Sequence, residues 1–122
     1  MVQTPIVSLD MAKAYLRVDS NDEDALIGIL LSSTEQMAMD VARLSTSDWE
    51  TIQKVTTDDD GKVLTVHTRK LKASEIIRMR NLLRVAILYA VGYLYEHREE
   101  ADHHDLMITL RDMLFAIREG VV

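Results

Sequence analysis

The sequence predicts a mainly α-helical protein, a small helical bundle built on one long central helix with a β-hairpin insertion around residues 51–68. Twelve of the 14 residues from Leu82 to Tyr95 are apolar or aromatic, so a helix there must be covered on several sides. Apolar residues recur at helical spacing before and after this stretch. Two segments rich in Thr and Val flank the turn Asp58-Asp59-Asp60-Gly61, which indicates the hairpin.

The first helix is predicted from Leu9 to Arg17, with Ser8 as its N-cap. Its apolar positions Leu9, Ala12 and Leu16, with Tyr15 as a further candidate, are expected to face the core, while Lys13 and Arg17 share another face.

A second helix is predicted to begin with the capping-box pair Ser20 and Glu23 and to run to about Leu44. Acidic residues in its first turn, Asp24 among them, oppose the positive end of the helix dipole. The residues predicted to face inward are Leu26, Ile27, Leu30, Leu31, Met37, Val41 and Leu44, and those predicted to face outward are Glu35, Gln36, Asp40 and Arg43.

The hairpin strands are predicted at Thr51–Thr57 and Lys62–Thr68, and they should pack on a helix or on a strand of a neighbouring subunit. The central helix is expected from about Ser74 to Glu100. A last helix is expected to begin at 102–105 and to stop at Gly120. Its core positions are Leu106, Leu110, Met113, Leu114 and Ile117.

Length and composition limit the class of protein. A chain of 122 residues fits one domain over residues 1–122, and 48% apolar with 28% charged residues is a globular composition. Without cysteine the chain forms no disulfide and no thiolate metal site. The N-terminus lacks the pattern of a signal peptide, so a cytosolic protein is expected. The apolar stretch is shorter than the ~20 residues of a membrane span and contains Arg84, so no membrane association is expected.

Charge is unevenly distributed along the chain. Residues 1–60 carry twelve acids and four bases, a charge of −8, whereas residues 61–122 carry eight acids and ten bases, a charge of +2. A basic patch could meet phosphates, an acidic protein surface or the acidic half of a neighbouring copy, or it could be a solvated face. The patch comprises Lys62, Arg69, Lys70, Lys72, Arg78, Arg80 and Arg84.

Two sequence blocks stand in a recognisable order. The first is Leu9-Asp-Met-Ala-Lys-Ala-Tyr-Leu-Arg-Val-Asp, followed by Asp24-Ala-Leu-Ile, and the second is Leu94-Tyr95-Glu96-His97-Arg98-Glu99. Together they resemble the phage head-tail connector proteins of the gp6-like type, also found in prophages. His97 stands where that family often has Asn. The signature residues are Leu9, Ala12, Lys13, Leu16, Arg17, Asp24, Leu26, Ile27, Leu94, Tyr95, Glu96, Arg98 and Glu99.

The resemblance implies a structural function. Such a protein would be a head-tail connector (adaptor) domain that forms a homo-oligomeric ring, dodecameric on the virion, between the portal and a stopper or tail-completion protein. The ring would leave a channel through which DNA passes without sequence-specific binding. Assembly would take place in the host cytoplasm, and the product would lie at the head-tail interface of the virion.

Other functions find weaker patterns. No enzyme activity, cofactor or metal is expected. Two motifs are each half of a metal-binding pattern: Glu100-x-x-His103, with His97 and His104 nearby, and Glu96-x-x-Glu99. The second half of each pattern is missing from the sequence. The alternative function is a small helical nucleic-acid-binding or DNA-packaging accessory protein that uses the basic patch at 62–84, although aromatic content is only 5% and net charge is −6.

Two arginines are expected to be buried or half-buried. Arg17 and Arg98 each follow an apolar stretch and have acids nearby, and a planar guanidinium suits the bridging of carboxylates across helix ends. Tyr95 and Glu96 are expected to join that network.

Overall fold

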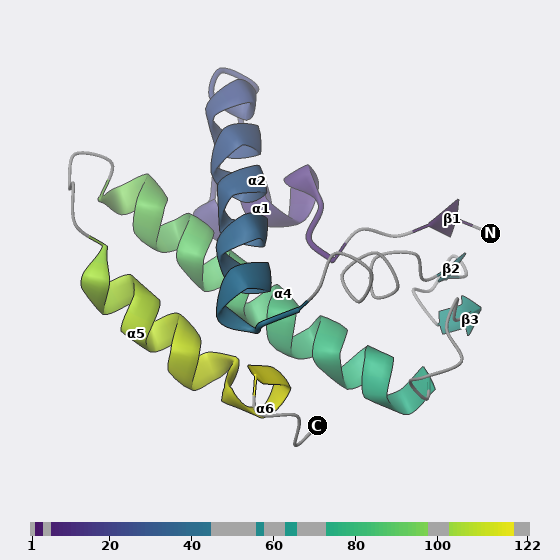
Figure 1. Cartoon of the computed structure of the whole chain (residues 1–122). Helices are drawn as coiled ribbons and strands as arrows, with labels where there is room; N and C mark the ends of the chain where they lie inside the picture. The colour runs from purple at the N-terminus through teal and green to yellow at the C-terminus, as the bar shows by residue number, and fades with distance from the viewer. Residues whose placement is uncertain are drawn as a thin grey trace.

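The computed structural model is mainly helical, which confirms that part of the predicted fold class (Figure 1). It describes residues 2–3, 6–44, 56–57, 63–65, 73–97 and 103–118. The described helices are α1 (Leu9–Leu16), α2 (Asp24–Val41), α4 (Ala73–Glu96), α5 (His104–Met113) and α6 (Phe115–Arg118). Helix α4, with 24 residues, is the longest of them. Helix α2 crosses α4, α1 contacts both, and α5 runs back antiparallel to α4.

Three short strands form an antiparallel sheet in the order β1-β2-β3. They are β1 (Val2–Gln3), β2 (Thr56–Thr57) and β3 (Val63–Thr65). The hairpin around residues 51–68 stays a prediction, because most of that range, including the acidic turn, lies outside the described residues. The other neighbour of β2 is the N-terminal strand of the same chain, whereas the sequence pointed to a helix or to a neighbouring subunit.

Helices α1 and α2 end in the same Schellman motif. Arg17 and Arg43 adopt left-handed backbone angles, with φ of 60° and 58°. The amide of Val18 donates to the Lys13 carbonyl (2.9 Å), and the amide of Leu44 donates to the Met39 carbonyl (3.1 Å). A non-glycine residue is uncommon in this conformation, so both arginines hold positions that glycine would occupy with less strain.

The N-termini of these two helices contrast. At α1 the prediction is confirmed, because the Ser8 hydroxyl accepts a hydrogen bond from the Met11 amide at 3.1 Å. At α2 the capping-box prediction is wrong: the helix begins at Asp24, and Glu23 in the cap position makes no side-chain cap bond. The Glu23 carboxylate instead accepts a hydrogen bond from the Tyr95 hydroxyl of α4 at 2.9 Å, a partner that local sequence does not reveal.

The core forms where α2, α4 and α5 pack together. Ile27 and Val41 are buried as predicted, and so are the Leu106, Leu110 and Leu114 positions on the last helical segment. That segment is divided at Leu114 into α5 and α6, whereas the sequence predicted one helix. The sequence analysis did not identify three small buried residues, two in α2 and one at its C-cap: Thr34, Ala38 and Ala42. Small side chains allow neighbouring helices to pack closely.

Glu35 is half-buried on α2 although it was predicted to face outward. Burial raises the pKa of its carboxyl above the ordinary value of 4.5, because the charged form loses hydration. Below pH 4.5 the group is neutral in folded and unfolded chains, and as pH rises through the raised folded pKa the folded state loses stability. We expect Glu35→Gln to be more stable than the parent at pH 7 and equal to it near pH 4, measured by urea unfolding at both pH values. Glu96→Gln, at an exposed position, is the control; an equal gain at both pH values would contradict the desolvation argument.

The two described glycines in helices differ in their surroundings. A Cβ atom added at Gly28 of α2 would meet no atom within 4 Å, whereas at Gly92 of α4 it would lie 3.0 Å from Cε1 of Tyr15. We therefore expect Gly28→Ala to raise the free energy of unfolding by about 1 kcal/mol, the helix propensity difference. Gly92→Ala is expected to gain less or to lose stability, because the Tyr15 ring must move. Thermal unfolding of both variants measures the difference, and equal gains would show that Tyr15 does not pack on Gly92.

Candidate functional site

Helices α1 and α2 are joined by the side chain of Lys13. Its Nζ lies 2.8 Å from Oδ1 of Asp24 and donates a hydrogen bond to Oδ1 of Asn21, also at 2.8 Å. The Lys13 side chain is 13% exposed and that of Asp24 is 34% exposed, so this ion pair is better protected from water than a surface pair. From the sequence, Lys13 was predicted to share a helix face with Arg17, and Asp24 was predicted to oppose the helix dipole. The ion pair between Lys13 and Asp24 was not predicted.

A second contact ties α2 to α4 at the same end of the bundle. The Tyr95 hydroxyl donates to Oε1 of Glu23, the residue before Asp24. Lys13 and Asp24 come from the first signature block and Tyr95 comes from the second, so the fold brings both blocks to one place. These signature residues thus hold three helices together.

Replacing Tyr95 with Phe tests this contact. We expect Tyr95→Phe to lower the free energy of unfolding by about 1–2 kcal/mol, because a partly buried hydrogen bond to a charged acceptor is lost. Tyr89→Phe is the matched control, since Tyr89 is 38% exposed on the same helix and its change should cost less than about 0.5 kcal/mol. Chemical denaturation measures both. Equal effects would show that the Tyr95 hydroxyl contributes nothing specific.

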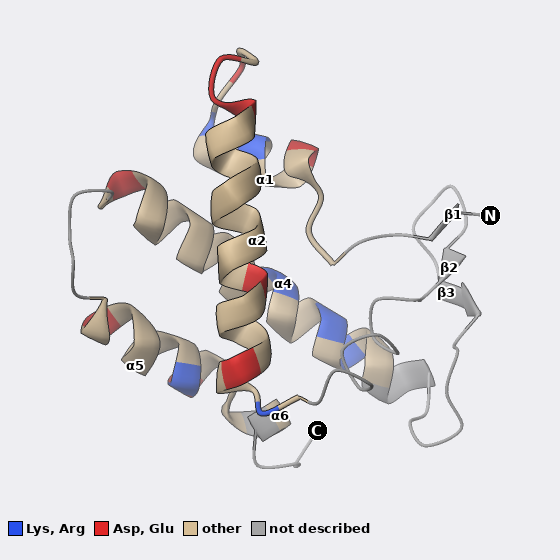
Figure 2. Cartoon of the chain, turned by 45° about the horizontal axis from the view of Figure 1, so that its top comes forward, with Lys and Arg blue, Asp and Glu red and all other residues tan. Residues whose placement is uncertain are grey.

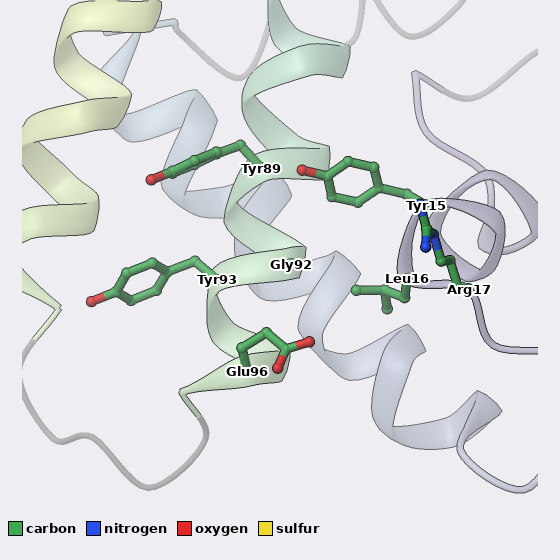
Figure 3. A pocket seen from close by; sticks show the side chains of 7 residues that line it. All are labelled: Tyr15, Leu16, Arg17, Tyr89, Gly92, Tyr93 and Glu96. Atoms are coloured by element: carbon green, nitrogen blue, oxygen red, sulfur yellow. The ribbon is translucent and has the colours of Figure 1, made fainter.

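Next to these contacts, an open groove with a volume of about 510 Å³ lies between α1 and α4 (Figure 3). The Tyr15 ring lies across Gly92, with 50% of the residue exposed, so the expectation that it faces the core is wrong. Glycine at position 92 is what permits this close approach. The lining residues are Tyr15, Leu16 and Arg17 of α1 and Tyr89, Gly92, Tyr93 and Glu96 of α4.

The predicted arginine network takes a different form. Arg17 is exposed, which corrects the prediction of a buried or half-buried base; it directly follows the last residue of α1 and has a left-handed backbone conformation. Glu96 is exposed and lines the same groove as Arg17, whereas Tyr95 bonds Glu23 instead. Arg98 and Glu99 lie outside the described residues.

The apolar signature residues belong to the core or its margin. Ala12 and Ile27 are fully buried, and Leu26 is half-buried. The partly buried signature residues that pack against the core are Leu9, Leu16 and Leu94.

The described residues of the basic patch lie on α4 (Figure 2), and two of the three are engaged within the protein. Arg80 is 4% exposed, and the pKa of its guanidinium is lowered first by desolvation and then by the charge of Arg84. Nε of Arg84 donates to the Ile6 carbonyl at 2.9 Å, which fastens the N-terminal segment to α4. Arg78 is exposed. The remaining patch residues lie outside the described residues: Lys62, Arg69, Lys70 and Lys72.

The histidines near the end of α4 gather around an aromatic ring. The His97 ring stacks on Tyr93 with centroids 4.3 Å apart, and His103 meets Tyr93 edge-on at 6.2 Å. Helix α4 ends at Glu96 and α5 begins at His104, so the two histidines at 97 and 104 do not share one continuous helix. Among the described residues, no group of three or more His, Asp or Glu side chains is arranged to hold a metal ion.

The chain was compared with known proteins. No curated protein and no solved structure matched it. None of the described helices is long and apolar enough to cross a membrane. Residues 6–116 match the family model of the phage gp6-like head-tail connector protein, a range that includes both signature blocks and every described helix at least in part. The chain therefore belongs to the phage gp6-like head-tail connector family, which gives it a structural role in a phage particle.

Proposed function

We propose that this chain, acting as one domain over residues 1–122, is the repeating subunit of a ring that joins a phage or prophage portal to a stopper or tail-completion protein. The observation that carries the proposal is the family match over residues 6–116. The ring would assemble in the host cytoplasm, remain at the head-tail interface of the virion and leave an axial channel for DNA. Its action would be mechanical, without catalysis or a cofactor.

The contacts at the α1–α2–α4 end support a rigid subunit. The Lys13–Asp24 and Tyr95–Glu23 contacts join three helices, and a ring that transmits load between two partners requires subunits that do not deform. The −8 and +2 halves of the chain would alternate around a head-to-tail ring. An acidic channel wall would repel phosphate and let DNA slide. We also propose that residues 51–68 form a hairpin of which β2 and β3 are the described part.

The experiment is co-expression with the portal protein of the same phage genome. We expect the two proteins to purify as one complex, and electron microscopy should show an added ring on one end of the portal. Twelve copies of the 13.9 kDa chain would add about 167 kDa, which light scattering measures. Portal expressed alone is the control. A portal that gains no mass and no density would contradict the proposed function.

Nucleic-acid binding is not retained as a second function. Arg80 is buried and Arg84 bonds a backbone carbonyl, so the described arginines of the patch do not form an open row of cations for a phosphate backbone. Titration with duplex DNA at several salt concentrations tests this choice. Tight binding that weakens steeply with salt would restore the alternative.

A further inference from the structure

Helix α4 carries exposed apolar residues in line with Gly92, the glycine over which Tyr15 of α1 lies. Val85 is 58% exposed and Tyr89 38% exposed, and both follow helical spacing toward Gly92 and Glu96. Toward the end of α4 this line of residues reaches the groove beside α1. We name this surface the acceptor face, and it comprises Tyr15 and Arg17 of α1 with Val85, Tyr89, Gly92 and Glu96 of α4.

A second exposed surface follows α5 and α6. Ile108 is 44% exposed and Phe115, the one phenylalanine of the chain, is 58% exposed. Leu114 beside Phe115 is fully buried, so the phenyl group stands outside the core of its own subunit. The exposed charges Arg111 and Asp112 lie between these two apolar residues. We name this surface the donor ridge: Ile108, Arg111, Asp112 and Phe115.

The two surfaces carry charges that can pair across a contact, and the acceptor face contains a groove. Each presents one acid and one base beside apolar area, Glu96 and Arg17 on one surface and Arg111 and Asp112 on the other. In the described part of the chain, these four side chains form no ion pair with one another. The groove has room for an aromatic side chain, since its 510 Å³ falls within the range of pockets that enclose small ligands.

One chain does not satisfy both surfaces by itself. Helix α5 runs antiparallel to α4 (Figure 1), so α6, which begins at Phe115, lies far from the C-terminal end of α4, where Gly92 and Glu96 line the groove. Two different surfaces on one subunit produce a head-to-tail contact, which closes into a ring if the rotation permits.

We propose that the donor ridge of one copy packs on the acceptor face of the next copy, with Phe115 in the groove, Arg111 facing Glu96 and Asp112 facing Arg17. This inference rests on the proposed function, because it names the subunit contact of the proposed ring. It also gives a reason for arginine at position 17, where glycine would relieve the left-handed backbone but would remove the guanidinium from the rim of the groove.

A mixing experiment tests the head-to-tail geometry. Tyr89→Glu removes the acceptor face and Phe115→Glu removes the donor ridge, and both positions are exposed, so folding should survive, which circular dichroism verifies. We expect the parent chain to gain mass with concentration and each variant alone to stay monomeric. An equimolar mixture should form a 1:1 complex of two 13.9 kDa chains and nothing larger, because only one intact contact remains. A monomeric mixture, or single variants that assemble like the parent, would overturn the inference.

Charge exchange tests the pairing of residues. Glu96→Arg and Arg111→Glu should each raise the dissociation constant between copies by about tenfold, and a chain with both changes should recover the parent value. Arg43→Glu is the control, since Arg43 is exposed at the end of α2 and belongs to neither surface, and it should have no effect. Arg17→Gly and Arg43→Gly both relieve the strain of a left-handed backbone conformation, but only Arg17→Gly should weaken association between copies. Failure of the double exchange to recover association would refute the Glu96–Arg111 pair.

Engineered cysteines provide a second readout, because the chain has none of its own. A Tyr89→Cys chain mixed with a Phe115→Cys chain should be joined by a short bis-maleimide. Ile29→Cys replaces Tyr89→Cys in the control, as Ile29 is 65% exposed on α2 and lies outside both surfaces. Equal cross-linking in the control would count against the proposed contact.

The outcomes for the contact and for the proposed function are separable. If the parent forms a ring on the portal and the surface variants do so equally well, the proposed function stands and the inference is overturned. If the 1:1 variant complex forms but the parent does not bind the portal, the inference stands and the proposed function fails. A parent and a variant mixture that remain monomeric up to about 1 mM would overturn the inference alone.

Discussion

Ile87→Ala is expected to lower the free energy of unfolding by about 3 kcal/mol. Ile87 is fully buried in the core cluster of α4, and truncation removes apolar contacts and leaves a cavity that neighbouring residues fill only in part. Domains of this kind are stable by about 5–15 kcal/mol, so the loss is a large fraction of the total. Urea denaturation followed by circular dichroism measures it.

Val85→Ala is the matched control for Ile87→Ala. Val85 precedes Ile87 by two residues on the same helix but is 58% exposed, so its truncation should change stability by less than about 0.5 kcal/mol. Similar losses at both positions would mean that α4 does not present its Ile87 face to the core. Because Val85 belongs to the proposed acceptor face, Val85→Ala should weaken association between copies.

Lys13→Ala is expected to destabilise the subunit by about 2 kcal/mol. Removal of the ammonium group leaves Oδ1 of Asp24, a buried atom, without its cation and also removes the bond to Asn21. The loss of one partner of a fully buried pair costs about 3–5 kcal/mol, and the partial exposure of Asp24 reduces this figure.

A double-mutant cycle isolates this pair. Lys13→Ala, Asp24→Ala and the double variant should give a coupling energy of about 1–2 kcal/mol. A coupling near zero would show that the ion pair is not energetically significant and that the loss in Lys13→Ala comes from its aliphatic stem. Tyr95→Phe in the same background should be additive if the two contacts act independently.

Much of the helical framework follows from the sequence because it depends on neighbours within one or two turns. The Ser8 cap, the approximate bounds of α1 and α2 and the inward positions Ile27 and Leu110 all come from hydroxyl placement and apolar spacing. The same local rules failed at Glu23, because its carboxylate bonds a residue 72 positions away. They also failed at Arg17, because an apolar stretch before a residue does not determine whether its own side chain is buried.

Part of the candidate site was visible as a set of residues but not as an arrangement. The resemblance marked Lys13, Asp24, Tyr95 and Glu96 without indicating that the first two pair, or that Tyr95 reaches Glu23 while Glu96 joins a groove. The Lys13–Asp24 pair had one usable signal in the sequence: a lysine on the first helix and an acid at the start of the next helix. The buried Thr34 and Ala38 gave little signal, because small residues score weakly in an apolar pattern.

By itself, the sequence determined the helical class, most inward-facing positions and the family, because these depend on local periodicity and on residues that can be read in order. Only the tertiary structure decided which charges meet, which apolar residues of α4 are exposed and where Tyr15 lies over Gly92. Those features depend on the crossing of helices that are far apart in the chain. Side-chain pairing across such a crossing is set by packing of the whole core rather than by any single segment.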